Sequence, residues 1–148
     1  MKIERDVDRF HSAQTNGNPT AYDRALAELR AGRKRSHWIW FVLPQLRGLG
    51  RSDTAQRYGL DGLGEARAYL ADPLLGQRLE QVIDVIHHQL QQPDQTLEQL
   101  MGGELDAAKT ISSLTLFEAA GLASATTLLN HLGRRCAGTI AQLNTQNG

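Results

Sequence analysis

A carboxylate and an ammonium group lie three residues apart at Asp106 and Lys109, in a stretch that otherwise carries apolar and hydroxyl side chains. At about 100° of rotation per helical residue, Asp106, Lys109 and Ser113 share one face. A helix that is apolar on most sides is normally buried, and buried polar groups must be paired or must line a wet cavity. Residues 106–117 are therefore either one wall of a polar pocket or a capped helix end with a simple ion pair, whose hydroxyls bond back to the backbone.

A second concentration of polar chemistry surrounds the two tryptophans, between basic residues, within residues 33–52. Guanidinium, ammonium and imidazole groups beside large aromatic rings suit a ligand that carries a phosphate and a planar ring. The alternative is a tryptophan-rich core beside a solvated basic surface, and the sequence leaves both open. The residues of this stretch that are expected to bind a ligand are Lys34, His37, Trp38, Trp40, Gln45 and Arg47.

We expect one polar pocket where residues 34–45 meet residues 106–117, with a small anionic molecule as its ligand. Asp106 and Lys109 are the candidate catalytic residues of this pocket. Hydroxyl groups complete the expected binding surface, and they belong to Ser112, Ser113 and Thr115.

The remaining reactive side chains favour no further site. His87 and His88 are adjacent, so on a helix their rings point about 100° apart and do not readily share a metal. No HExxH or paired CxxC pattern is present, and we predict no metal and no cofactor. Cys136 lies beside Arg134 and Arg135, which can lower the pKa of a thiol, but no histidine pattern accompanies it. We therefore interpret Cys136 as a thiol without a catalytic or metal-binding role.

Composition bounds the class of protein. The chain has 148 residues, a formal net charge of zero and 41% hydrophobic residues, which is ordinary for one globular domain. The zero net charge argues against a nucleic-acid partner. A single cysteine suits a reducing cytosol, and no apolar run is long enough for a membrane span or a secretion signal. We expect a cytoplasmic protein of undetermined oligomeric state.

The elements that must position these side chains are predicted to be helices. Residues 38–43 are apolar on every side, so periodicity does not distinguish helix from strand there, and the helical surroundings favour a short buried helix ended by Pro44. The clearest amphipathic stripe is Leu75, Leu79, Val82, Ile83 and Ile86. The expected fold is a single all-α domain over residues 1–148, with about eight helices of ordinary length and a frayed end at 133–148. The expected helical segments are 5–14, 20–31, 38–43, 52–58, 65–70, 72–92, 96–101, 105–120, 124–132 and a last turn at 139–143.

Four strings in the sequence resemble one known family. They are DRFHSAQ at residues 8–14, the segment 22–52 with HWIWFVLPQLRGLG, EARAYLADPLLGQRL at 65–79, and DAAKTISSLTLF at 106–117. The chain is similar to the bacterial domain of unknown function family 1810, some members of which carry a mistaken calpastatin label. The resemblance implies a compact all-α fold and no established activity. Residues 133–143 depart from the family pattern, which usually has an acidic residue before the final helix.

A remote kinship of this family with the NADAR group, which acts on ADP-ribose derivatives, would imply nucleotide-sugar binding or N-glycoside cleavage. Hydrolysis at an anomeric carbon needs an acid/base carboxylate, here Asp106, and cationic phosphate holders. Those holders would be Lys109, Lys34 and Arg47, while Trp38 or Trp40 stacks the base. The competing hypothesis is a non-enzymatic interaction module, in which the tryptophans are core and the basic flank meets an acidic protein partner.

Overall fold

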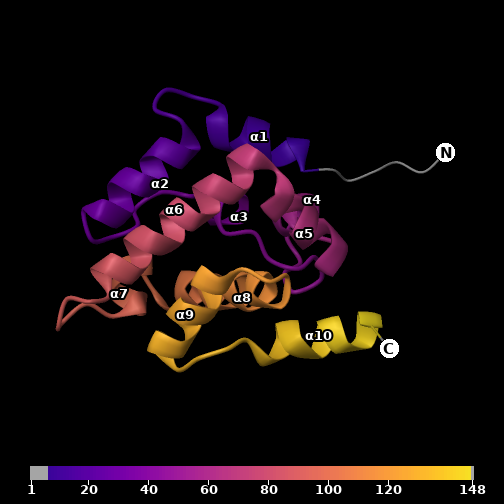
Figure 1. Ribbon diagram of the computed structural model, residues 1–148. Coiled ribbons are helices and arrows are strands. Elements are labelled where there is room, and N and C mark those ends of the chain that lie inside the picture. Colours follow the sequence, from indigo (N-terminus) through magenta and orange to yellow (C-terminus); the bar gives the residue numbers. More distant parts are fainter. Residues whose placement is uncertain (1–6, 148) are drawn as a thin grey trace.

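The structure is a computed structural model that describes residues 7–147. Over that range the chain forms ten α-helices, where about eight were expected, and no β-strand (Figure 1), which confirms the predicted all-α fold. The first residues of the first expected helix, Arg5 and Asp6, lie outside the described residues. The helices are α1 Asp8–Thr15, α2 Ala21–Arg30, α3 Ile39–Val42, α4 Asp53–Tyr58, α5 Leu63–Ala71, α6 Pro73–Gln89, α7 Leu97–Met101, α8 Glu104–Ala119, α9 Ala123–Leu132 and α10 Ala137–Asn147.

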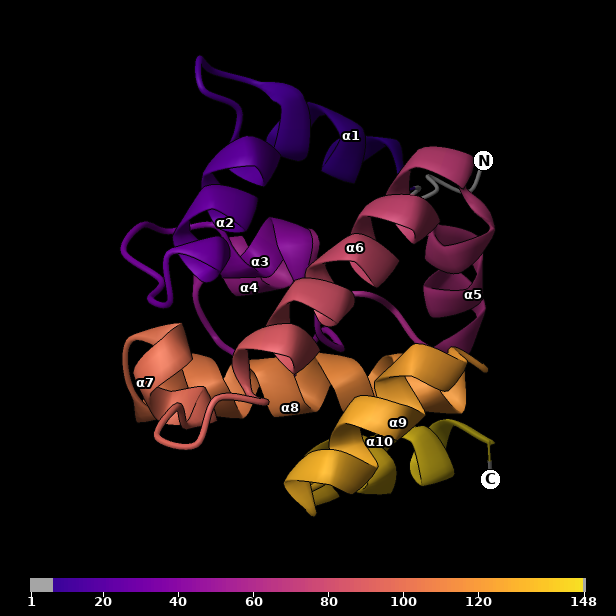
Figure 2. The same cartoon turned by 60° about the vertical axis from the view of Figure 1, so that its left-hand side comes forward.

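Two long helices, α6 and α8, organise the packing of the others. Helix α6 contacts α2, α5 and α9, and α8 contacts α5, α7, α9 and α10. In both views α6 crosses the molecule diagonally, with α2 on one side and the α8–α9 pair on the other (Figures 1 and 2). The short helix α3 contacts both α6 and α8. The stretch that carries the tryptophans is therefore held directly against the helix that carries Asp106.

Several helix ends coincide with the capping residues that the sequence contains. The Thr20 side chain accepts a hydrogen bond from the Asp23 N–H at 3.1 Å and begins α2. Asp72 accepts two backbone hydrogen bonds in the first turn of α6, where Pro73 has no N–H to leave unpaired. Gly32 follows α2 with a left-handed φ of +93°, which costs glycine no steric strain. These local signals make the element boundaries predictable.

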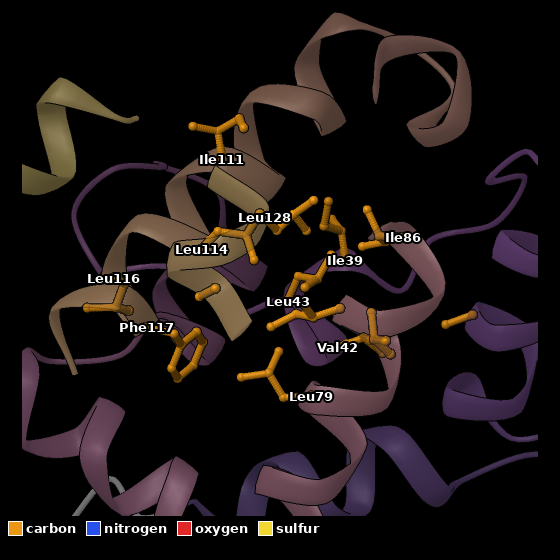
Figure 3. Close-up of a cluster of buried hydrophobic side chains, with 14 of the residues drawn as sticks. Ile39, Val42, Leu43, Leu79, Ile86, Ile111, Leu114, Leu116, Phe117 and Leu128 are labelled. Atoms are coloured by element: carbon orange, nitrogen blue, oxygen red, sulfur yellow. The ribbon is translucent and has the colours of Figure 1, made fainter. Parts of the chain in front are cut away.

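The stripe predicted on α6 lies at the centre of the hydrophobic core. All five of its members are buried, namely Leu75, Leu79, Val82, Ile83 and Ile86. Around α3, Ile39, Val42 and Leu43 pack between α6 and α8 (Figure 3). Within segment 38–43 only Ile39–Val42 form the short helix that we expected, against α6 and α8. Ile39 and Val42 are buried, whereas Trp40 and Phe41 are half-buried.

The C-terminal segment is longer and better packed than its sequence predicts. Helix α10 has 11 residues, whereas only a frayed turn was expected at 139–143. It docks on α8 through the buried side chain of Leu143 and through the hydroxyl oxygens of Ser112 and Thr139, which lie 2.9 Å apart. One buried leucine and one hydroxyl pair give little periodicity, which explains the short prediction. No helix among the described residues is long and apolar enough to cross a membrane.

Candidate functional site

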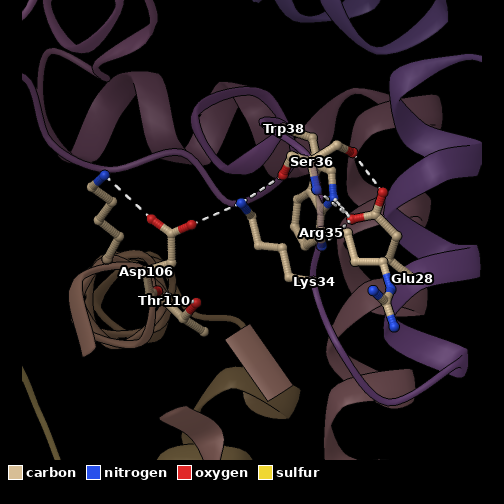
Figure 4. A network of polar contacts seen from close by, with 8 residues as sticks. Glu28, Lys34, Arg35, Ser36, Trp38, Asp106 and Thr110 are labelled. Carbon is tan, nitrogen blue, oxygen red and sulfur yellow. Dashed lines mark hydrogen bonds and ion pairs between the residues drawn. The ribbon is translucent and has the colours of Figure 1, made fainter. Parts of the chain in front are cut away.

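The structure buries Lys34, although lysine is usually exposed. Its side chain is 5% exposed, and Nζ lies 2.7 Å from Asp106 Oδ2. The same ammonium donates to the Ser36 carbonyl oxygen at 2.6 Å and lies 5.1 Å from the centre of the Trp38 ring (Figure 4). A buried charge is tolerated only when it is paired and hydrogen-bonded, and Lys34 meets both conditions.

Asp106 lies between two ammonium groups. Its second oxygen, Oδ1, is 3.3 Å from Lys109 Nζ, and the two side chains are 24% and 30% exposed. Burial alone would raise the pKa of Asp106, but the hydrogen bond and charge of Lys34 and the charge of Lys109 outweigh it, so that the pKa lies below its usual value. Asp106 is therefore an ionised carboxylate at neutral pH, partly open to solvent.

Trp40 completes this arrangement on the solvent side. Its ring is half-buried, and Lys109 Nζ lies 4.6 Å from the ring centre, within the range of a cation–π contact. Asp106 and Trp40 thus hold the same ammonium from two directions. We call the surface formed by Trp40, Asp106 and Lys109 the Trp40–Lys109 face.

Two predicted ligand-binding side chains are buried without a hydrogen-bond partner. They are Gln45, through Nε2, and Ser113, through Oγ. Among the described residues Arg24 Nε is the third such atom. Buried polar atoms are normally satisfied, and unpaired ones commonly mark an ordered water or a ligand. Gln45 follows α3 and Ser113 lies on α8, so both come from the segments that meet at this site.

The sequence matches the family described as "Protein of unknown function (DUF1810)" over residues 4–146. The chain belongs to the DUF1810 family. It is also similar to the conserved hypothetical protein Rv1873 from Mycobacterium tuberculosis, whose crystal structure superposes with a TM-score of 0.83 at 43% sequence identity. That match covers 94% of this chain and 96% of the mycobacterial one. A search of curated proteins found no match.

The DUF1810 description and the mycobacterial protein's name assign no activity. The family match confirms the resemblance seen in the sequence, and the structural match agrees with the all-α fold.

Sequence reasoning missed Glu28 on α2. Its carboxylate accepts hydrogen bonds from the Arg35 and Ser36 N–H groups, the Ser36 hydroxyl and Trp38 Nε1, at 2.5–2.9 Å (Figure 4). Burial alone would raise the pKa of Glu28, but the hydrogen bonds that it accepts outweigh it and lower the pKa to about 2. Glu28 thus fixes the turn that presents Lys34. In the sequence, Glu28 falls on the same helix face as Ala21 and Ala25. A carboxylate is unexpected on such a face, and this position could have indicated its role.

Trp38 belongs to the core of the DUF1810 fold. It is completely buried, and its Nε1 is bonded to Glu28 Oε1 at 2.9 Å. No face of this ring is open to a ligand, so the stacking role that we predicted for either tryptophan can fall only to Trp40.

Four other predicted residues do not join the Trp40–Lys109 face. His37 is exposed. Arg47 pairs with Asp61 at 2.5 Å, and both side chains remain about 40% exposed. Ser112 and Thr115 point to the α10 side of α8, where the first meets Thr139 and the second accepts from the Cys136 N–H at 3.0 Å. Ser112 and Thr115 thus contact the C-terminal segment, whereas Asp106 and Lys109, on another face of α8, contact Lys34 and Trp40.

The described hollows of the surface lie away from the Trp40–Lys109 face. The largest of them, about 490 Å³, lies between α6 and α9. Another, of about 260 Å³, lies between α8 and α10, and Thr115 is the predicted site residue that lines it. The expected pocket between residues 34–45 and 106–117 is not among them.

Proposed function

We propose that this protein binds a small anionic molecule with a planar ring, of the nucleotide-derived class, at the Trp40–Lys109 face. The observation that supports the proposal most is the position of Lys109. Its ammonium is part-exposed and held over the Trp40 ring by Asp106. A cation fixed beside an aromatic face offers both contacts that a phosphate linked to a base requires.

The local charge also favours an anion. Between Glu28 and Asp53 the sequence has no acidic residue. It has six basic ones there, namely Arg30, Arg33, Lys34, Arg35, Arg47 and Arg51. Lys34 and Arg47 are paired with Asp106 and Asp61, and the other four add positive charge to this stretch, which attracts anions even when the net charge of the chain is zero.

If the ligand is an N-glycoside, the geometry supports a role for Asp106 different from the acid/base role that we first expected. A carboxylate with a lowered pKa is a poor proton donor at neutral pH. It can instead stabilise the positive charge that develops at an anomeric carbon in an oxocarbenium-like transition state. Lys109 would then hold the phosphate. N-glycoside cleavage is thus the reaction class that we propose for the site.

A second candidate function rests on a different observation. Leu105 is 79% exposed, one helical turn before Lys109 on α8. Leu105 adds exposed apolar area one turn from Lys109, whose ammonium contacts the half-buried Trp40 ring, and aromatic residues are enriched where proteins bind one another. Together with the burial of Trp38, this favours an interaction module whose partner presents apolar and acidic side chains.

Titration with ADP-ribose, followed by tryptophan fluorescence, tests the first function. We expect ADP-ribose to quench the wild type, and Trp40→Phe to remove the response, because Trp38 is shielded in the core. Arg67→Met, which removes an exposed cation on α5, serves as the control and should respond like the wild type. Quenching that persists in Trp40→Phe, or no response to ADP-ribose, AMP, NAD⁺ or ribose 5-phosphate, would count against this face as a nucleotide site and favour the interaction module.

A further inference from the structure

Helices α6 and α9 run side by side in the same direction (Figures 1 and 2). The hydroxyl of Ser124, at the beginning of α9, donates to Oε1 of Glu80, in the middle of α6, at 3.4 Å. Two turns later on each helix, the ring centres of His87 and His131 lie 5.2 Å apart. The two residues of each pair are separated by the same number of positions in the sequence. The helices therefore advance together along their length, and their last turns lie next to each other.

The distance between the two ring centres is compatible with two imidazoles that share one metal ion. Two imidazoles on one tetrahedral Zn²⁺, with Zn–N distances of about 2.0–2.1 Å, have ring centres about 5 Å apart. His87 is half-buried and His131 is exposed. Within the described residues neither ring makes a hydrogen bond to the protein. Their nitrogens are therefore available to an ion that enters from solvent.

A carboxylate lies next to this pair. Asp84 is three residues before His87 on α6, a spacing that places two side chains on one helical face. Both residues line the hollow of about 490 Å³ between α6 and α9, and both line a smaller one of about 270 Å³. No group of three metal-ligating side chains is preassembled in the part of the chain that the structure describes. Asp84 is exposed, so a rotamer change can bring its carboxylate to the histidines at little cost.

The electrostatic surroundings favour a cation. Between Arg78 and Lys109 the sequence contains no lysine or arginine. His87 and His131 lie in the last turns of α6 and α9, where the helix dipoles place partial negative charge. Arg30 lines a neighbouring hollow together with Asp84. Arg134 and Arg135, which follow His131 in the chain, are paired with the carboxylates of Glu98 and Glu118.

We propose that His87, His131 and Asp84 form a binding site for a divalent transition-metal ion of the Zn²⁺ type, with water in the remaining position. Two imidazoles and a carboxylate are a common ligand set for such ions. The sequence pairs His87 with its neighbour His88, whose ring points elsewhere, whereas the fold pairs it with a residue from another helix. This site is separate from the Trp40–Lys109 face and does not depend on the function proposed there.

Calorimetric titration of the chelator-treated, tag-free protein with ZnCl₂ tests the site. We expect one Zn²⁺ per chain and a higher melting temperature in its presence. His131→Ala should weaken binding by more than about tenfold, as should His87→Ala, because loss of even an outer-shell partner costs about 10–100-fold. His88→Ala removes an exposed histidine one position after His87 and should bind like the wild type.

Cobalt(II) provides an independent readout, since its visible absorption reports tetrahedral coordination in the wild type and should disappear in His131→Ala. His131 is exposed, so this variant should melt like the wild type without metal. The proposal is wrong if the wild type binds no Zn²⁺, if His131→Ala binds it equally well, or if His88→Ala causes the same loss. Half an equivalent of Zn²⁺ with dimer formation would also overturn it, because the ligands would then come from two chains.

Discussion

Lys34→Met is expected to lower the free energy of unfolding by about 2–4 kcal/mol, because it leaves Asp106 and the Ser36 carbonyl without their buried donor. Removing one partner of a buried ion pair typically costs about 3–5 kcal/mol. Here Lys109 keeps a contact with Asp106 and reduces the loss. Urea unfolding of the wild type and the variant at neutral pH measures the difference.

Two further variants make this prediction specific. Arg35→Met removes the neighbouring cation, whose side chain is exposed, and should change stability by no more than about 0.5 kcal/mol. The double variant Lys34→Met with Asp106→Asn should lose less free energy of unfolding than the two single variants lose in sum. The difference should be at least about 0.5 kcal/mol, because both residues take part in one interaction. Equal stability of Lys34→Met and the wild type would show that the ion pair is not buried in solution.

Glu28→Ala is expected to lower the free energy of unfolding by about 2–3 kcal/mol, because the Trp38 indole and two backbone N–H groups lose a charged acceptor at once. Glu28→Gln keeps one carbonyl oxygen and should cost less. Asp94→Asn, which changes an exposed carboxylate in a turn, is the control and should be neutral. The same urea unfolding measures all three, and an Ala variant as stable as the control would contradict the role of Glu28.

Glu28 also makes the free energy of unfolding depend on pH. Its pKa falls from about 4.5 to about 2 on folding, so its contribution is complete above pH 4.5 and is lost as the pH falls towards 2. After allowance for screening of a partly exposed carboxylate, that contribution is about 1–2 kcal/mol. The stability gap between the wild type and Glu28→Gln should therefore narrow over this window. A gap that stays constant from pH 6 to pH 2.5 would show that Glu28 does not titrate with folding.

The helices could be predicted because their signals are local. Thr20, Asp72 and Gly32 act on the nearest turn, and the α6 stripe repeats with the helical period. The length of α10 could not be predicted in the same way. It depends on contacts with α8, such as the one between Ser112 and Thr139, which are 27 residues apart in the chain, and a single docking leucine leaves no period to detect.

The candidate site could be predicted only in part. Asp106 and Lys109 stand out in the sequence as charged residues in apolar surroundings, and Lys34 as a cation close to the tryptophans. The fold brings the three together. The sequence could not separate Trp38 from Trp40, because segment 38–43 is apolar on all sides and only its packing decides which ring is covered. Glu28 was missed because its hydrogen bonds go to a turn that has no helical or strand period.

The most direct test of the Trp40–Lys109 face combines melting with calorimetric titration of ADP-ribose for Lys109→Met and Asp106→Asn. Lys109→Met should melt close to the wild type, because a part-exposed ion pair contributes at most about 1 kcal/mol. Asp106→Asn keeps a carbonyl oxygen for Lys34 and should remain folded at the assay temperature. Both variants should lose ADP-ribose affinity by more than about tenfold, as expected when a charge-assisted contact worth more than about 1.4 kcal/mol is removed. Unchanged affinity in both, or melting that collapses in both, would contradict a binding site and leave an ion pair with a purely structural role.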